Sequence, residues 1–147
     1  MKKLLLALLL VSSVFSFSAE RTLSYEETFL DKKTGIVYAI GQKTPYTGVV
    51  ENYKFLSGDR VLEGRIIFKN GLREGLTKLY YEDGSLKAEK FYKNDKLQGI
   101  SKIYYPNGKL QIEASFKEDK LDGISKEYDE TGKIIDQTTF KDNKQIN

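Results

Sequence analysis

A 24-residue period governs residues 75–146 of this chain. Three segments, 75–98, 99–122 and 123–146, align without gaps. Each has an opening glycine, then a lysine, a tyrosine, a turn glycine and an aromatic–lysine pair at the same places. A looser copy, residues 48–74, comes before them and is three residues longer. A fixed period of this length predicts a repeat array, in which each unit packs only against its neighbours.

Each unit is expected to form a β-hairpin. Strand-like stretches of about six residues are separated by turn-prone pairs, an arrangement typical of antiparallel strands. The turns within the units are Asp83-Gly84, Asn107-Gly108 and Thr131-Gly132, and those between units are Asn70-Gly71, Asn94-Asp95, Glu118-Asp119 and Asp142-Asn143. The opening glycines Gly75, Gly99 and Gly123 permit a bulge where each unit begins. The sequence therefore predicts an all-β fold: an elongated, twisted antiparallel β-meander of tandem hairpins.

The alternation within each hairpin assigns side chains to two faces. Leu76, Lys78 and Tyr80 share one face, and their equivalents recur in all three regular units, so this face is predicted to be the folding core. The opposite face loses its apolar residues in the last unit, where Glu127 and Asp129 stand; this unit is predicted to be a solubilising cap.

The apolar residues of that opposite face form one candidate interaction surface. It is either a second buried face or an exposed binding surface, and the alternation does not decide between them. Its members are Leu79, Tyr81, Ile103 and Tyr105.

The lysines of the aromatic–lysine pairs form a second candidate surface, along one turn edge. Such a row either deters sheet-to-sheet aggregation or meets an anionic membrane surface or an acidic partner. The row consists of Lys69, Lys93, Lys117 and Lys141.

The N-terminal part differs from the array. Residues 1–19 combine Lys2 and Lys3, an apolar run and small residues, which is typical of a secretory signal peptide. The sequence thus predicts an exported protein, located in the periplasm or cell envelope or secreted. Residues 20–47 form a lead-in segment with the first strand or strands, and the repeat domain covers residues 48–147. A weak capping box at Ser24 and Glu27 predicts one helical turn.

Composition narrows the possible chemistry. The net charge is +3 and falls to +1 without residues 1–19, with both signs interspersed, so no nucleic-acid partner is expected. Histidine and cysteine are absent, and the paired acids lie mostly in predicted turns. We therefore expect no catalytic residues, no metal site and no cofactor. The oligomeric state stays open.

The chain resembles the MORN-repeat proteins, in particular the bacterial variant group labelled YwqK-type antitoxins. The resemblance rests on the entry Pro45-Tyr46-Thr47-Gly48, on the link Phe68-Lys69-Asn70-Gly71, and on the spacing of glycine, tyrosine, glycine and leucine over 75–86 and 99–110. It covers about residues 36–144. It implies an elongated sheet of consecutive hairpins, and its label implies a toxin as partner.

Three functions follow as expectations. The first is an exported, non-enzymatic protein-interaction module at the cell envelope or a host surface, which an array that presents a surface favours. The second is peripheral binding to anionic lipids through the lysine edge. The third is the antitoxin role that the resemblance implies.

Overall fold

The structure, a computed structural model, describes residues 21–146. The predicted signal peptide, residues 1–19, lies outside the described residues. Within the described part, no helix is long and apolar enough to span a bilayer.

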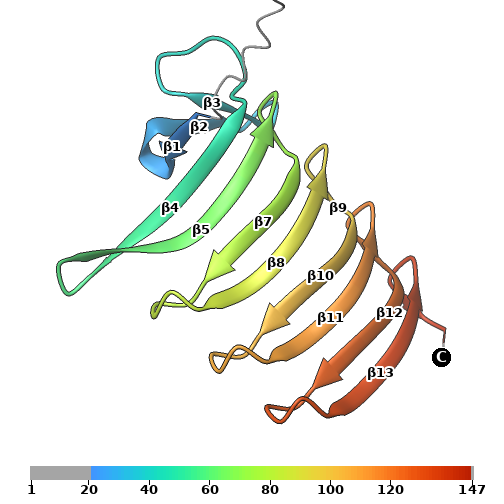
Figure 1. Cartoon of the computed structure of the whole chain (residues 1–147). Helices are drawn as coiled ribbons and strands as arrows, with labels where there is room; N and C mark the ends of the chain where they lie inside the picture. Colours follow the sequence, from blue (N-terminus) through green and yellow to red (C-terminus); the bar gives the residue numbers. More distant parts are fainter. Residues whose placement is uncertain (1–20, 147) are drawn as a thin grey trace, which may run out of the picture.

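The predicted meander is confirmed (Figure 1). Consecutive hairpins lie side by side in sequence order, and nearly all neighbouring strands are antiparallel. The main strands are β4 (Gly48–Leu56), β5 (Asp59–Lys69), β7 (Gly75–Tyr80), β8 (Leu86–Lys93), β10 (Gly99–Tyr104), β11 (Leu110–Lys117), β12 (Lys120–Tyr128) and β13 (Ile134–Lys141). Two-residue strands extend the sheet at the turns between units: β6 (Leu72–Arg73), β9 (Lys96–Leu97) and β14 (Lys144–Gln145).

The lead-in segment closes one end of the array. β1 (Thr22–Ser24) pairs in parallel with β4, which makes the sheet mixed at this point. The predicted helical turn is present as η1 (Tyr25–Glu27), with both hydrogen bonds of the capping box. β2 (Thr28–Asp31) and β3 (Ile36–Ala39) form a separate two-stranded sheet.

This small sheet covers one face of the first unit. Leu23, Ala39 and Tyr46 of the lead-in form a buried cluster with Val50 and Phe68. The array therefore has a covered first unit, while the later units receive no such cover from the described chain.

Bulges recur at the same places in every unit. At the first junction, Arg65 pairs with Lys78 and Phe68 pairs with Arg73, so the chain that enters the second unit has two more residues between these pairs than β5 has. The next two junctions repeat this difference. The opening glycines lie in these bulges with φ of +87° at Gly75, +68° at Gly99 and +121° at Gly123. This backbone is easy for glycine and strained for other residues, so the glycines set the phase of the repeat.

The prediction that the face with Leu76, Lys78 and Tyr80 forms the core is wrong. Leu76, Ile100 and Ile124 are 38%, 55% and 46% exposed. The buried residues of the regular units, Thr77, Ala88, Tyr92, Ser101 and Ala114, lie on the opposite face. We call this buried side face A. The side with Leu76, Lys78 and Tyr80 is face B.

Small side chains explain why face A is the buried one. Threonine, serine and alanine lie at neighbouring positions of face A, between larger residues of adjacent strands. An aromatic row runs beside them, in which each ring residue is paired with the strand that follows its turn: Phe68, Tyr92 and Phe140 with the two-residue strands β6, β9 and β14, and Phe116 with the start of β12. The Arg73 guanidinium lies over the Tyr92 ring at 4.0 Å, which adds a cation–π contact.

The turns between units fasten each hairpin to the one before it. The second residue of each turn, Asp95, Asp119 or Asn143, has φ of +66° to +68°. Its backbone N–H donates to the carbonyl of Arg73, Leu97 or Leu121, at 2.9–3.1 Å. The side-chain oxygens of Asp119 and Asn143 accept from the N–H of Leu97 and Leu121, both at 2.8 Å. We call this reciprocal pair of bonds the turn clasp.

The turn clasp predicts a graded series at Asp119. Asp119→Asn keeps the acceptor and, like Asn143, tolerates the left-handed backbone, so stability should change by less than about 0.5 kcal/mol. Asp119→Gly loses only the acceptor and should cost about 1 kcal/mol. Asp119→Ala also strains the backbone and should cost about 2–3 kcal/mol. Urea unfolding measures all three, and equal losses for asparagine and alanine would contradict the clasp.

Ser101 gives a prediction of opposite sign. Its hydroxyl oxygen is buried and lacks a hydrogen-bond partner within residues 21–146. Because an unsatisfied polar group costs stability, Ser101→Ala should raise the free energy of unfolding by about 1 kcal/mol. Ser125, at the same place in the last unit, is only half-buried and provides the control. A loss of stability in Ser101→Ala, measured by thermal unfolding, would refute this account.

Candidate binding surfaces

Face B presents an apolar row that crosses the regular units. Leu76 and Phe91 lie directly opposite each other on β7 and β8. Ile100 and Ile124 follow at the same place in the next two units. Their exposed fractions run from 38% to 55%. We call these four residues the apolar row.

A ladder of alternating charges runs beside the apolar row. Lys78 and Lys102 face Glu89 and Glu113 across their hairpins, with N–O distances of 3.5 and 3.8 Å. Glu89 also lies opposite Lys102 of the next unit, and Glu113 opposite Lys126. The lysines thus alternate with acids from the second unit to the fourth, so both signs of charge recur at regular intervals along the array.

Tyrosines border the ladder on its other side. The Tyr104 hydroxyl donates to Glu89 Oε2 at 3.0 Å. Burial and this bond to an anion both raise the pKa of Tyr104 above its usual range. The hydroxyl is therefore protonated at neutral pH and acts as a donor. Face B thus offers apolar, charged and hydrogen-bonding groups in parallel rows.

The first candidate surface, Leu79, Tyr81, Ile103 and Tyr105, does not form one continuous patch, because its aliphatic and its tyrosine residues have different surroundings. Leu79 and Ile103 are half-buried on face A, opposite Ala88 and Ile112. The Tyr81 hydroxyl donates to the Tyr104 carbonyl at 2.6 Å, and Tyr105 makes the same bond to Tyr128 at 2.8 Å. The two tyrosines therefore join successive units, a role that the sequence did not predict. Asp129 takes their place in the last unit.

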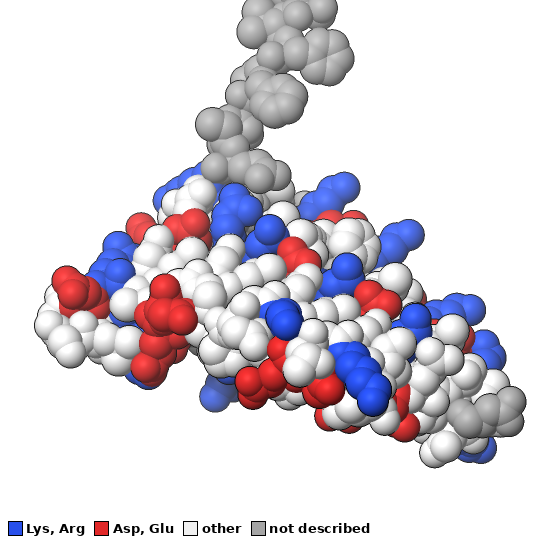
Figure 2. Space-filling view, turned by 60° about the horizontal axis from the view of Figure 1, so that its bottom comes forward, with Lys and Arg blue, Asp and Glu red and all other residues white. Residues whose placement is uncertain are grey.

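The structure places the four lysines of the lysine edge at corresponding strand ends. Lys69, Lys93, Lys117 and Lys141 are exposed at the ends of their strands, beside the turns between units. Lys141 pairs with Asp122 at 2.7 Å, whereas the other three have no ion pair within the described chain. Figure 2 shows acidic and basic side chains interspersed on the face in view, with no large field of one sign.

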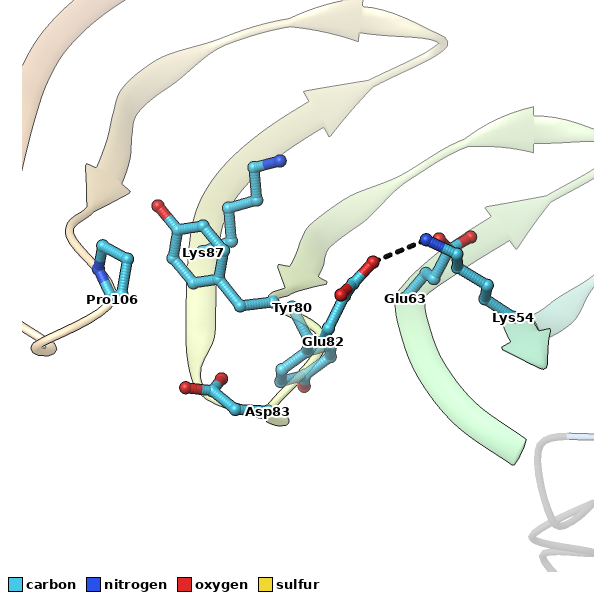
Figure 3. Close-up of a pocket in the computed structure, with 8 residues that line it drawn as sticks. Lys54, Glu63, Tyr80, Glu82, Asp83, Lys87 and Pro106 are labelled. Carbon is cyan, nitrogen blue, oxygen red and sulfur yellow. Dashed lines mark hydrogen bonds and ion pairs between the residues drawn. The ribbon is translucent and has the colours of Figure 1, made fainter. Parts of the chain in front are cut away.

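One depression lies where the period is broken. The first hairpin is longer than the others, and a hollow of about 570 Å³ opens between it and the turn of the second unit. It is lined by Lys54, Glu63, Tyr80, Tyr81, Glu82, Asp83, Lys87 and Pro106 (Figure 3).

Charged groups of this hollow form ion pairs and hydrogen bonds with other residues of the chain. Lys54 pairs with Glu82 at 2.6 Å, and this contact raises the pKa of Lys54. The Ser85 hydroxyl and N–H lower the pKa of Asp83, so this acid is an anion at neutral pH. A general acid instead requires a raised pKa. Residues 21–146 also contain no group of three acidic side chains placed to share a metal ion.

The apolar row is the feature that sequence reasoning missed. Leu76, Ile100 and Ile124 recur at one place in the repeat, and this recurrence predicts that they belong to the core. In the structure these residues are exposed. The signal that marks the other face is the series of small residues, Thr77, Ser101 and Ser125, next to the alternating aliphatics. Small side chains fit between close strands, whereas both faces carry some large apolar residues.

Comparison with known proteins agrees with this architecture. The model of the MORN repeat variant matches residues 73–94, 97–118 and 121–142. Each match begins at the residue whose carbonyl accepts the turn-clasp bond, Arg73, Leu97 or Leu121. It ends at the first residue of the turn that makes this bond. No curated protein and no solved structure matches the chain. MORN repeats are generally binding modules without enzymatic activity. The chain therefore carries three tandem MORN-type repeats.

Proposed function

We propose that this chain is an exported, non-enzymatic binding protein that engages a protein partner at the cell envelope or a host surface through the apolar row of face B. The observation that carries the proposal is the exposure of Leu76, Phe91, Ile100 and Ile124 at successive places along one face. Ser115 on β11 lies opposite Ile100 and interrupts the row between Ile100 and Ile124. Exposed apolar side chains that gather on one face and are bordered by polar ones are typical of protein-interaction sites.

The surroundings of the row favour a protein partner. The charge ladder and the tyrosines lie beside it, so a partner meets apolar contacts flanked by directional polar groups. Charged and polar groups at such a border set orientation and specificity more than affinity. The signal-peptide pattern of residues 1–19 supports export.

Two pairs of isoleucines test this surface. Ile100→Ser with Ile124→Ser removes both isoleucines of the row, and Ile134→Ser with Ile135→Ser removes isoleucines of 46% and 56% exposure outside it. We expect the first pair to weaken partner binding at least about tenfold, the effect of losing more than 1 kcal/mol at a contact centre. The control pair should bind normally.

The measurement has two stages. The mature chain captures proteins from envelope and host-surface extracts, and the purified partner is then titrated against each variant. Equal thermal unfolding of the variants shows that the fold is kept. Unchanged affinity in Ile100→Ser with Ile124→Ser would exclude the apolar row.

An anionic membrane is the second candidate partner. Lys69, Lys93 and Lys117 are exposed and free of ion pairs in the described chain, so their charges are available at one edge. Basic groups held near an anionic bilayer each contribute about 1 kcal/mol, which falls with salt.

Vesicle co-sedimentation tests this edge. Replacing Lys69, Lys93 and Lys117 by glutamine should weaken binding to anionic vesicles about a hundredfold, from about 1 kcal/mol for each lysine. Replacing Lys32, Lys33 and Lys43, which are exposed in the lead-in, serves as the control of equal charge. Absence of binding by the unmodified protein at low salt would rule this candidate out.

A further inference from the structure

Face A has an uncovered stretch with an ordered distribution of charge. The lead-in packs on the first unit only, which leaves the second, third and fourth units without a covering layer in the described chain. In the second unit, the paired residues of β7 and β8 on face A include one charged residue, Lys90, which lies opposite Thr77. The fourth unit has Glu127 and Asp136 at such positions.

The acids of the fourth unit oppose each other. Glu127 on β12 lies directly across from Asp136 on β13, and both are exposed. Like charges at directly opposite positions in a sheet are destabilising. Neither acid has an ion pair within residues 21–146, and neither does Lys90. The Thr138 hydroxyl donates to Asp136 Oδ2 at 3.0 Å. All three charges thus remain available for an ion pair with a group outside the described chain.

The unit between them is apolar. Ile103 lies opposite Ile112 at the centre of face A, and both are half-buried. A hollow of about 140 Å³ opens here, lined by Lys90, Leu97, Ser101, Ile103, Ile112, Ala114 and Phe116. The uncovered stretch is therefore basic, apolar and acidic in order along the array.

We propose that face A of the second to fourth units is the interface of a homodimer, in which two copies pack face to face and antiparallel about a two-fold axis through the third unit. This axis sets the second unit of each copy against the fourth unit of the other. Lys90 lies one face A position along the strands from the level of Glu127 and Asp136, a step of about 7 Å that its long side chain can span. Lys90 therefore pairs with these acids of the partner subunit at both ends of the interface, and the apolar third units meet at the centre. A surface with opposite charges at its two ends is complementary to itself under this symmetry.

This dimer is distinct from the proposed partner contact. It uses face A, whereas the apolar row lies on face B, so the double isoleucine variant and the charge variants report on different surfaces. The dimer also neutralises the opposed acids, which explains why two carboxylates are tolerated side by side.

Charge reversal tests the dimer. Sedimentation equilibrium of the mature chain should show a dimer at about 100 μM, where a micromolar Kd gives mostly dimer. Lys90→Glu should be monomeric, because three acids then meet at each end. Glu127→Lys with Asp136→Lys should also be monomeric, because three lysines meet. Lys93→Glu, on the same strand but outside face A, should remain dimeric.

Mixing the two monomeric variants is the decisive arm. An equimolar mixture should form a heterodimer. The acid introduced by Lys90→Glu then meets the two introduced lysines of the other variant, and the unchanged Lys90 of that variant meets two acids. Recovery of the dimer shows that both variants are folded. A monomeric unmodified chain, a dimer that survives either reversal, or a mixture that stays monomeric would each overturn the proposal.

Discussion

Each regular unit of this array holds the preceding one by a turn whose second residue both donates to and accepts from the backbone 22 residues earlier. A hairpin in isolation is marginal in water, and these units share no central core. Stability must therefore come from contacts between neighbours, which the turn clasp supplies at one edge. The hydroxyls of Tyr81 and Tyr105 supply them at the other edge.

The clasp also explains the division of the sheet into two surfaces. Because it fixes the bulge at each opening glycine, every unit enters the sheet in the same phase. Residues one unit apart then fall into rows, and the rows on the two sides differ in size and charge. Face A takes small and aromatic side chains and holds the hairpins together. Face B carries the apolar row and the charge ladder toward solvent.

Much of the fold could be predicted from the sequence because its signals are local. Turn pairs, alternation and a fixed period are properties of short segments, and the helical turn at Tyr25–Glu27 follows from the capping box Ser24/Glu27. The buried face could not be predicted in this way. Leu76 and Leu79 are both leucines on one strand, and only packing between strands decides which is more exposed.

The candidate surfaces show the same limit. The position of the lysine edge could be predicted because a strand end follows directly from the turns. Alternation predicts Tyr81 and Tyr105 as surface aromatics, but their hydroxyls reach carbonyls 23 residues further on, in the next unit. Contacts across a whole period depend on bulges and twist, which alternation within one strand does not encode.

The last unit lacks the groups that would receive a successor. Asp129 stands where Tyr81 and Tyr105 bond the following hairpin, and Gln137 stands where Glu89 and Glu113 face a lysine of the next unit. The third unit, in contrast, has the groups to bond both a predecessor and a successor. Gene duplication of residues 99–122 would thus lengthen the molecule in whole hairpins without altering either end, so that overall reach can evolve separately from the terminal chemistry.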